Sequence, residues 1–160
     1  MKAYATEFIR NLAVIGHGDV GKTQLISSLL YVAGATPRWG KVQEGTTVTD
    51  HDEDSIARKI TLNIALDHLE HRDTKINFID TPGYAAFVAH ARPALRVADC
   101  ALAVVDGVKG VEVQTEKTWA YANEFMVPRM MVVMTAWMAK LGTLALGTSG
   151  RSLPIATPCS

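Results

Sequence analysis

The sequence lacks most of the features that would direct it to a particular compartment or polymer. Its only two cysteines, Cys100 and Cys159, are too few for a disulfide framework, and nothing around them has the spacing of a zinc site. Its 16 basic and 16 acidic residues cancel, so no overall charge attracts it to nucleic acid or a membrane surface. No apolar run approaches the roughly 18 residues of a membrane span, and the start, MKAYATEFIRN, lacks the apolar core of a secretory signal. We therefore expect a cytoplasmic protein with no membrane partner and no direct DNA binding.

Apolar segments alternate with helical patterns along most of the chain. Short β-rich runs predict strands at residues 8–15, 60–69, 75–80, 101–105 and 129–134, with a hairpin turn at 70–73. Helical spacing predicts helices at 22–32, 84–97 and 114–125, the second broken or kinked by Pro93. Residues 35–58 have no clear period. This alternation predicts an α/β fold, with a mostly parallel sheet and helices on both faces.

The stretch GHGDVGKT, from Gly16 to Thr23, matches the phosphate-loop motif G-x-x-x-x-G-K-[ST] between a predicted strand and a predicted helix. In this motif the backbone N–H groups wrap the phosphates, Lys22 offers a charge to the β- and γ-phosphates, and Thr23 gives its hydroxyl to Mg²⁺. His17 occupies a variable position, and we expect its side chain to face solvent or to pack against the loop. An ordinary glycine-rich turn is the alternative; the motif in this context favours a P-loop NTPase.

A second motif, DTPG at Asp80 to Gly83, ends another predicted strand. Asp80 is placed to hold Mg²⁺ through water, and the Gly83 N–H can approach a γ-phosphate and lose that contact after hydrolysis. Thr61, in ARKITL at the end of the irregular segment, could complete the metal shell. Phosphate loop, long switch, threonine and DTPG in this order indicate a GTPase.

With these motifs the chain resembles the GTP-binding domain of translation elongation factor G. The resemblance runs from about Phe8 to Met134, over IRNLAVIGHGDVGKT, GKVQEGTTVTD, ARKITL, KINFIDTPGY, GVEVQTEKTWAYANEF and VPRMMVV. It implies a monomeric, ribosome-dependent GTPase that uses GTP, GDP and Mg²⁺, with the ribosome as partner of the full-length family member.

The motifs and the resemblance together give a set of expected site residues. Thr23, Thr61 and Asp80 are the expected Mg²⁺ ligands, and Lys22 and Tyr84 the expected catalytic residues. The expected nucleotide-binding residues are Gly16, His17, Gly18, Asp19, Val20, Gly21, Lys22, Thr23, Gln24, Asp80, Thr81, Pro82, Gly83 and Tyr84.

Two departures from the family pattern bear on activity. The family usually has histidine after DTPG, where it positions the attacking water, whereas this chain has Tyr84. A tyrosine with a pKa near 10 can donate a hydrogen bond but cannot supply an imidazolium charge. Before the threonine, Arg58-Lys59 replaces Arg-Gly. We therefore expect slow turnover, as in a divergent paralogue.

The end of the chain departs further. The family follows the last matched strand with Asn-Lys-x-Asp, whose aspartate binds guanine, whereas this chain reads Thr135-Ala136-Trp137-Met138. One inserted base regroups the codons of this stretch to give Asn-x-x-Asp, and the last 36 residues contain no acid. We predict a partial translational-type GTP-binding domain at residues 1–134, incomplete at the C-terminus, and interpret residues 135–160 as an aberrant, frameshifted tail. An intact natural C-terminus is the alternative.

Two further functions remain open beside a ribosome-dependent GTPase. One is a non-enzymatic truncated fragment with residual phosphate binding and no selectivity for guanine. The other is a ribosome-binding regulatory module that turns nucleotide over slowly because of Tyr84.

Overall fold

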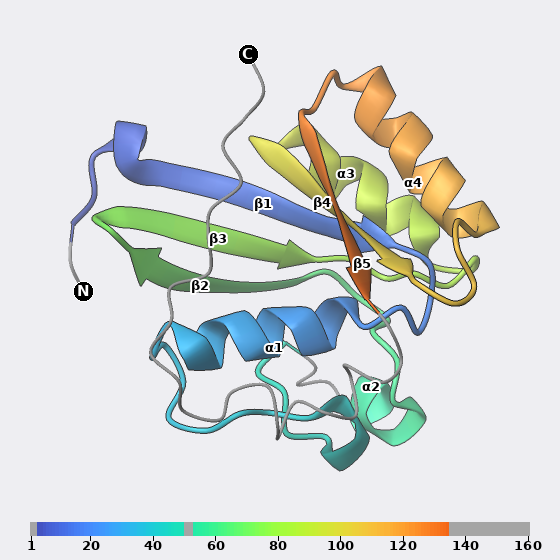
Figure 1. Cartoon of the computed structure of the whole chain (residues 1–160), viewed down its shortest axis with the longest axis horizontal. Helices are drawn as coiled ribbons and strands as arrows, with labels where there is room; N and C mark the ends of the chain where they lie inside the picture. The colour runs from blue at the N-terminus through green and yellow to red at the C-terminus, as the bar shows by residue number, and fades with distance from the viewer. Residues whose placement is uncertain (1–2, 50–52, 135–160) are drawn as a thin grey trace.

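A computed structural model of the chain describes residues 3–49 and 53–134. Within these residues the strands form a five-stranded sheet in the order β2-β3-β1-β4-β5 (Figure 1). Neighbouring strands are parallel except in the β2–β3 hairpin. The strands are β1 (Ile9–Gly16), β2 (Ala65–His71), β3 (Thr74–Asp80), β4 (Cys100–Asp106) and β5 (Arg129–Met134).

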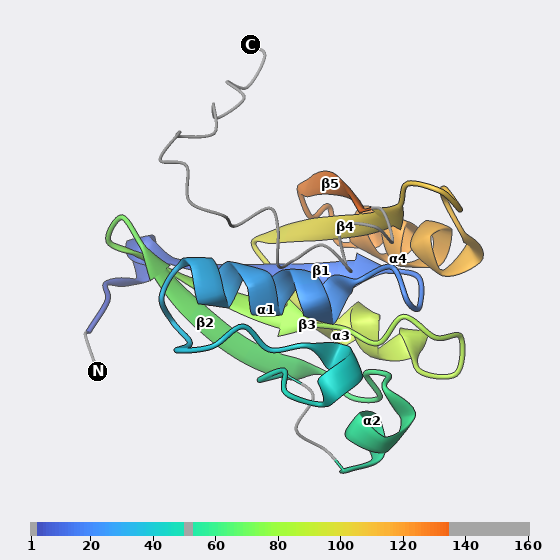
Figure 2. The ribbon, with the colours of Figure 1, turned by 60° about the horizontal axis from the view of Figure 1, so that its bottom comes forward.

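Helices cover both faces of the sheet, as Figures 1 and 2 show from two directions. Helix α1 (Lys22–Val32) lies on one face, α3 (Ala91–Arg96) and α4 (Val113–Glu124) lie on the other, and the short α2 (Glu53–Arg58) lies outside these layers. Single 3-10 turns occur at Thr6–Phe8, Val42–Glu44 and Val88–His90. The predicted α/β class is thus confirmed. Within the described part of the chain, no helix is long and apolar enough to cross a membrane.

The central strand β1 divides the core between the two faces. Val14 packs with α1 and β3 side chains such as Ile26 and Phe78, whereas Ala13 and Ile15 pack toward α3 and α4. This alternation follows from the two-residue period of a strand. A parallel strand covered on both faces reads as a continuous apolar run, which is how β1 and β4 read in the sequence.

Helix α1 has the bounds that the sequence predicts because glycines mark both ends. Gly21 precedes it with φ of 91°, and Gly34 follows it with φ of 73°. The Ala35 N–H donates to the Leu30 carbonyl (2.9 Å) and the Gly34 N–H to the Tyr31 carbonyl (3.0 Å). These two bonds are the Schellman arrangement, which satisfies carbonyls at the helix end.

Two predicted elements are shorter than expected. The predicted helix 84–97 is wrong over its first half, since α3 begins only at Ala91 after a 3-10 turn. Pro93 lies in the first turn of α3, where its missing N–H would have no partner in the helix. The strand expected at 60–69 begins at Ala65, and before it Thr61 contacts Thr23 of α1.

The segment 35–58 contains more structure than its lack of periodicity suggested. It forms the turn at Val42–Glu44 and then α2, which has Glu53 and Asp54 in its first turn and Arg58 in its last. Acids at the start and a base at the end complement a helix dipole, and this signal could have identified α2. The tail at 135–160 lies outside the described residues.

Gly16, the last residue of β1, provides a stability test. Its φ is 142°, and a Cβ there would collide with the carbonyl oxygen of Val104 on the paired strand. We expect Gly16→Ala to lower the free energy of unfolding by about 3 kcal/mol or more, since it adds a backbone collision to an unfavourable φ. The urea midpoint measures this. Gly34→Ala is the matched control, because Gly34 has positive φ with nothing within 4 Å of a Cβ, and it should cost about 1 to 2 kcal/mol. Equal losses would contradict the role assigned to the Val104 contact.

Candidate functional site

The candidate site lies where the chain reverses direction across the sheet. From β1 the chain passes through α1, α2 and the edge strand β2 to β3 on one side of β1, and from β3 through α3 to β4 on the other side. In open α/β sheets such a switch point forms a crevice at the carboxyl ends of the strands. The GHGDVGKT loop follows β1, and DTPG follows β3. Both predicted motifs therefore leave the same edge of the sheet.

Lys22 opens α1 and points back into the loop. Its Nζ donates to the carbonyl oxygens of His17 (2.7 Å) and Gly16 (3.3 Å), and the residue is only 6% exposed. Burial lowers the pKa of Lys22 to about 8, although the nearby carboxylates of Asp80 and Asp19 partly offset this. The Lys22 ammonium is buried away from water and has two carbonyl oxygens as partners. A phosphate group placed beside it would stabilise its charge.

Three side chains whose oxygen atoms could bind a metal ion, those of Thr23, Thr61 and Asp80, meet next to Lys22. The Thr23 hydroxyl donates to Asp80 Oδ2 (2.7 Å) and lies 2.9 Å from the Thr61 hydroxyl. Because one hydroxyl carries one proton, Thr61 must donate to Thr23 in this arrangement. Asp80 is fully buried and Thr23 is 7% exposed. Hydroxyl and carboxylate oxygens are hard ligands of the kind that Mg²⁺ prefers, so the three residues fit this ion.

The segment Thr81 to Gly83 is held tightly against the loop. The Thr81 hydroxyl donates to the carbonyl of Val14 in β1 (2.6 Å), and Thr81 is fully buried. A Cβ on Gly83 would collide with Lys22 Nζ and with the His17 carbonyl. Gly83 therefore allows the second motif to approach the first at backbone distance.

Tyr84 lies across the phosphate loop. Its phenol donates to Asp19 Oδ2 (2.5 Å), and its ring lies over Gly18, where a Cβ would be 3.0 Å from the ring. Burial, followed by the hydrogen bond to Asp19, raises the pKa of Tyr84 to about 12. The phenol thus stays neutral over the whole physiological range, and its single proton is directed at a carboxylate.

Two predicted loop residues direct their side chains elsewhere. The side chain of His17 turns toward Glu112 before α4, with 3.6 Å between Nε2 and Oε1, and Glu112 lies outside the phosphate loop. The amide of Gln24 bonds to the backbone of Gly40 and Val42. Nucleotide binding by Gln24 stays a prediction.

Contacts from outside the two motifs could not be read from the sequence. Ser27 is buried and donates to the Gly40 carbonyl (2.8 Å), and no motif marks either residue. The pairing of Asp19 with Tyr84 joins a variable loop position to a residue 65 positions later. The remaining predicted loop residues, Val20 and Gly21, lie in the bend before α1, where Val20 is buried.

Comparison with known proteins identifies relatives of this chain. The model of the elongation factor Tu GTP-binding domain matches residues 7–137. The mitochondrial ribosome-releasing factor 2 of Scheffersomyces stipitis is 44% identical over 78% of this chain and 15% of its own length. Elongation factor G of Dehalococcoides mccartyi is 36% identical over 98% of this chain and 24% of its own length.

A solved structure agrees in fold. A crystal structure of a protein from Thermus thermophilus matches with a TM-score of 0.76 and 39% identity, over 86% of this chain and 22% of the other. The chain thus spans between 15% and 24% of the length of these relatives. Since the family model covers most of the chain, from the strand that leads into the phosphate loop through the last strand of the sheet, the chain belongs to the elongation factor Tu GTP-binding domain family.

Proposed function

We propose that this chain binds GTP and GDP with Mg²⁺ and hydrolyses GTP, as the nucleotide-binding part of a ribosome-dependent translation factor similar to elongation factor G. The observation that carries the proposal is the meeting of Thr23, Thr61 and Asp80 beside the buried Lys22. The names of the relatives, elongation factor G and ribosome-releasing factor 2, support the ribosome as partner.

Each residue has a separate task in this proposal. Lys22 neutralises the β- and γ-phosphates, and the loop N–H groups from Gly16 to Thr23 surround them. Thr23, Thr61 and Asp80 would hold Mg²⁺, directly or through water; when bound, the ion would neutralise charge on the phosphate oxygens. Gly83 brings its backbone to the γ-phosphate. The attacking water would be positioned from the side of Tyr84.

A slow-turnover regulatory module is the second candidate, and one contact favours it. The Tyr84 proton is donated to Asp19, so toward a water molecule the phenol oxygen offers lone pairs and no charge. Binding of nucleotide would be retained while hydrolysis stays slow.

The first test is nucleotide binding with and without metal. We expect Mg²⁺ to tighten binding of a fluorescent GDP to the wild type by about tenfold or more, and we expect Asp80→Asn to lose most of this effect, because a neutral amide holds the ion poorly. Titrations with and without EDTA measure it. Equal affinities with and without Mg²⁺ would contradict the proposed metal site. Equal affinities for GTP and ATP would instead indicate a fragment that binds phosphate without recognising the base.

The lowered pKa of Lys22 predicts a pH dependence. Bound phosphates must raise this pKa again, so above pH 8 binding requires uptake of a proton. We expect the dissociation constant of GDP to be constant below about pH 7.5 and to rise about tenfold by pH 9, which isothermal titration calorimetry can follow. We expect Lys22→Arg to bind GDP more weakly than the wild type. Because its guanidinium stays charged, its dissociation constant should not change over this pH range. The same slope in both proteins would show that Lys22 is not the titrating group.

Tyr84→His tests the second candidate. We expect ribosome-stimulated phosphate release to rise at least tenfold, since general acid–base groups contribute about 10² to 10⁴ in rate. The rate should also acquire a pH dependence near 6.5, where histidine titrates. Tyr84→Phe removes the hydroxyl but keeps the aromatic ring that lies over Gly18, so it tests the hydroxyl separately from the ring. An unchanged rate for Tyr84→His would remove Tyr84 as the cause of slow turnover.

A further inference from the structure

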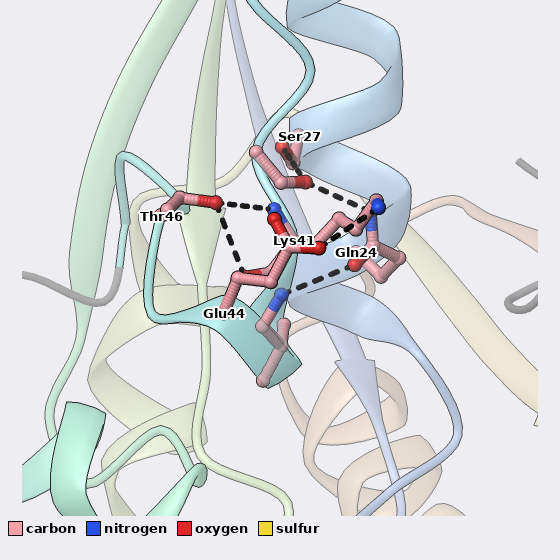
Figure 3. A network of polar contacts seen from close by, with 7 residues as sticks. Gln24, Ser27, Lys41, Glu44 and Thr46 are labelled. Atoms are coloured by element: carbon pink, nitrogen blue, oxygen red, sulfur yellow. Dashed lines mark hydrogen bonds and ion pairs between the residues drawn. The ribbon is translucent and has the colours of Figure 1, made fainter. Parts of the chain in front are cut away.

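The turn formed by residues 39–46, here named the docked turn, lies along α1 (Figure 3). The side-chain amide of Gln24 contacts its backbone at two points: Nε2 donates to the Gly40 carbonyl (3.0 Å), and Oε1 accepts from the Val42 N–H (3.3 Å). Ser27 Oγ donates to the same Gly40 carbonyl (2.8 Å). These bonds satisfy two backbone groups of the turn, as a neighbouring strand would.

Gly40 has no room for a side chain, chiefly because the returning backbone of the turn lies against it. Gly40 is buried, and a Cβ there would be 2.5 Å from the Thr46 carbonyl oxygen and 3.0 Å from Ser27 Oγ. Next to it, the Trp39 indole N–H donates to Ser28 Oγ (3.0 Å). Ser28 in turn donates to the carbonyl of Gln24 (2.8 Å). A row of polar groups on α1 therefore contacts the backbone of Gly40 and Val42 and the indole of Trp39.

The docked turn also closes on itself. The Lys41 N–H donates to Thr46 Oγ1 (2.9 Å), the Thr46 N–H to the Lys41 carbonyl (3.2 Å), and the Gly45 N–H to the Val42 carbonyl (3.0 Å). The exposed ion pair between Lys41 and Glu44 (2.9 Å) adds little to this. The shape of the turn is thus set by its own backbone bonds.

The two ends of the segment 39–61 depend on different contacts with neighbouring residues of α1. The docked turn is held by the side chains of Gln24, Ser27 and Ser28. Of these three, Gln24 is also among the expected nucleotide-binding residues, and it holds the turn through its side-chain amide. Thr61, by contrast, meets α1 at the Thr23 hydroxyl, within the candidate metal site. The candidate metal site therefore touches this segment directly at its Thr61 end.

We propose that Gln24 and Ser27 are positioning residues that keep the docked turn on α1 whether or not nucleotide is bound, so that the first switch segment has a fixed half and a responsive end at Thr61. The responsive end rests on the proposed nucleotide binding. The docking itself requires no nucleotide.

Trypsin can test both parts, because Lys41 lies in the docked turn and the exposed Lys59 lies two residues before Thr61. Cleavage is followed by mass spectrometry in nucleotide-free protein, with GDP and Mg²⁺, and with a non-hydrolysable GTP analogue. We expect cleavage after Lys41 to agree within about twofold in all three states, while the analogue slows cleavage after Lys59. Gln24→Ala should speed cleavage after Lys41 about tenfold in every state, because local opening becomes easier.

Controls separate local from global opening. Cleavage after Lys117 in α4 reports unfolding of the whole domain and should not change in Gln24→Ala. Gln24→Glu keeps the length and can still accept from Val42 but cannot donate to Gly40, so it should resemble Gln24→Ala. Gln43→Ala is the matched control, because Gln43 lies in the same turn, is exposed and bonds to Lys59 rather than to α1.

Two results would overturn the proposal. One is a slowing of cleavage after Lys41 by the analogue that equals the slowing after Lys59, since the docked turn would then depend on nucleotide. The other is wild-type cleavage after Lys41 in Gln24→Ala. If the chain binds no nucleotide, the proposed function fails, and the Gln24→Ala comparison in nucleotide-free protein still decides whether the amide docks the turn.

Discussion

The position of β1 between β3 and β4, parallel to both, is the constraint on which the site depends. The register pairs Val14 with Asp80 on one side and Gly16 with Val104 on the other. Because the three strands run the same way, the loop after β1 and the motif after β3 leave the sheet at one edge. The bond from Thr23 to Asp80 joins them there. A shift of one residue in the β1–β3 pairing would move the Asp80 carboxylate to the other face of the sheet and separate it from Thr23.

The polar groups at this edge are arranged for a ligand at some cost in stability. Lys22 and Asp80 are both buried, and burial alone would disfavour both charges. Carbonyls of the loop and the hydroxyl of Thr23 compensate partly, since they give each charged group a hydrogen-bond partner. Such partly compensated charges are typical of functional sites, where groups are oriented before the ligand arrives. The apolar packing of β1 on both faces supplies the stability that the site itself lacks.

How much the sequence predicted differs by element, for physical reasons. Helix α1 was predictable to the residue, because glycines and periodicity mark its ends, and the loop motifs identified Lys22, Thr23 and Asp80. The start of α3 was not predictable, since Pro93 looks like a helix breaker in the sequence. The first turn of a helix tolerates proline, and Pro93 lies there. The docking of Gly40 on Gln24 and Ser27 was not visible either, because backbone groups supply half of that contact and leave no residue pattern. Tertiary contacts between irregular segments carry no period from which to infer them.

The contact between Tyr84 and Asp19 separates two properties that GTPases usually combine. In the function we propose, nucleotide and metal binding depend on Lys22, Thr23 and Asp80, whose residue types this chain keeps. In the same proposal, activation of water depends on Tyr84, whose only proton is donated to Asp19 and whose pKa of about 12 keeps it neutral. Since the same bond holds the ring against Gly18, the phenol also helps to hold the DTPG motif against the phosphate loop. In the proposed function, Tyr84 would therefore retain the bound nucleotide and slow its hydrolysis, which is the behaviour expected of the slow-turnover candidate.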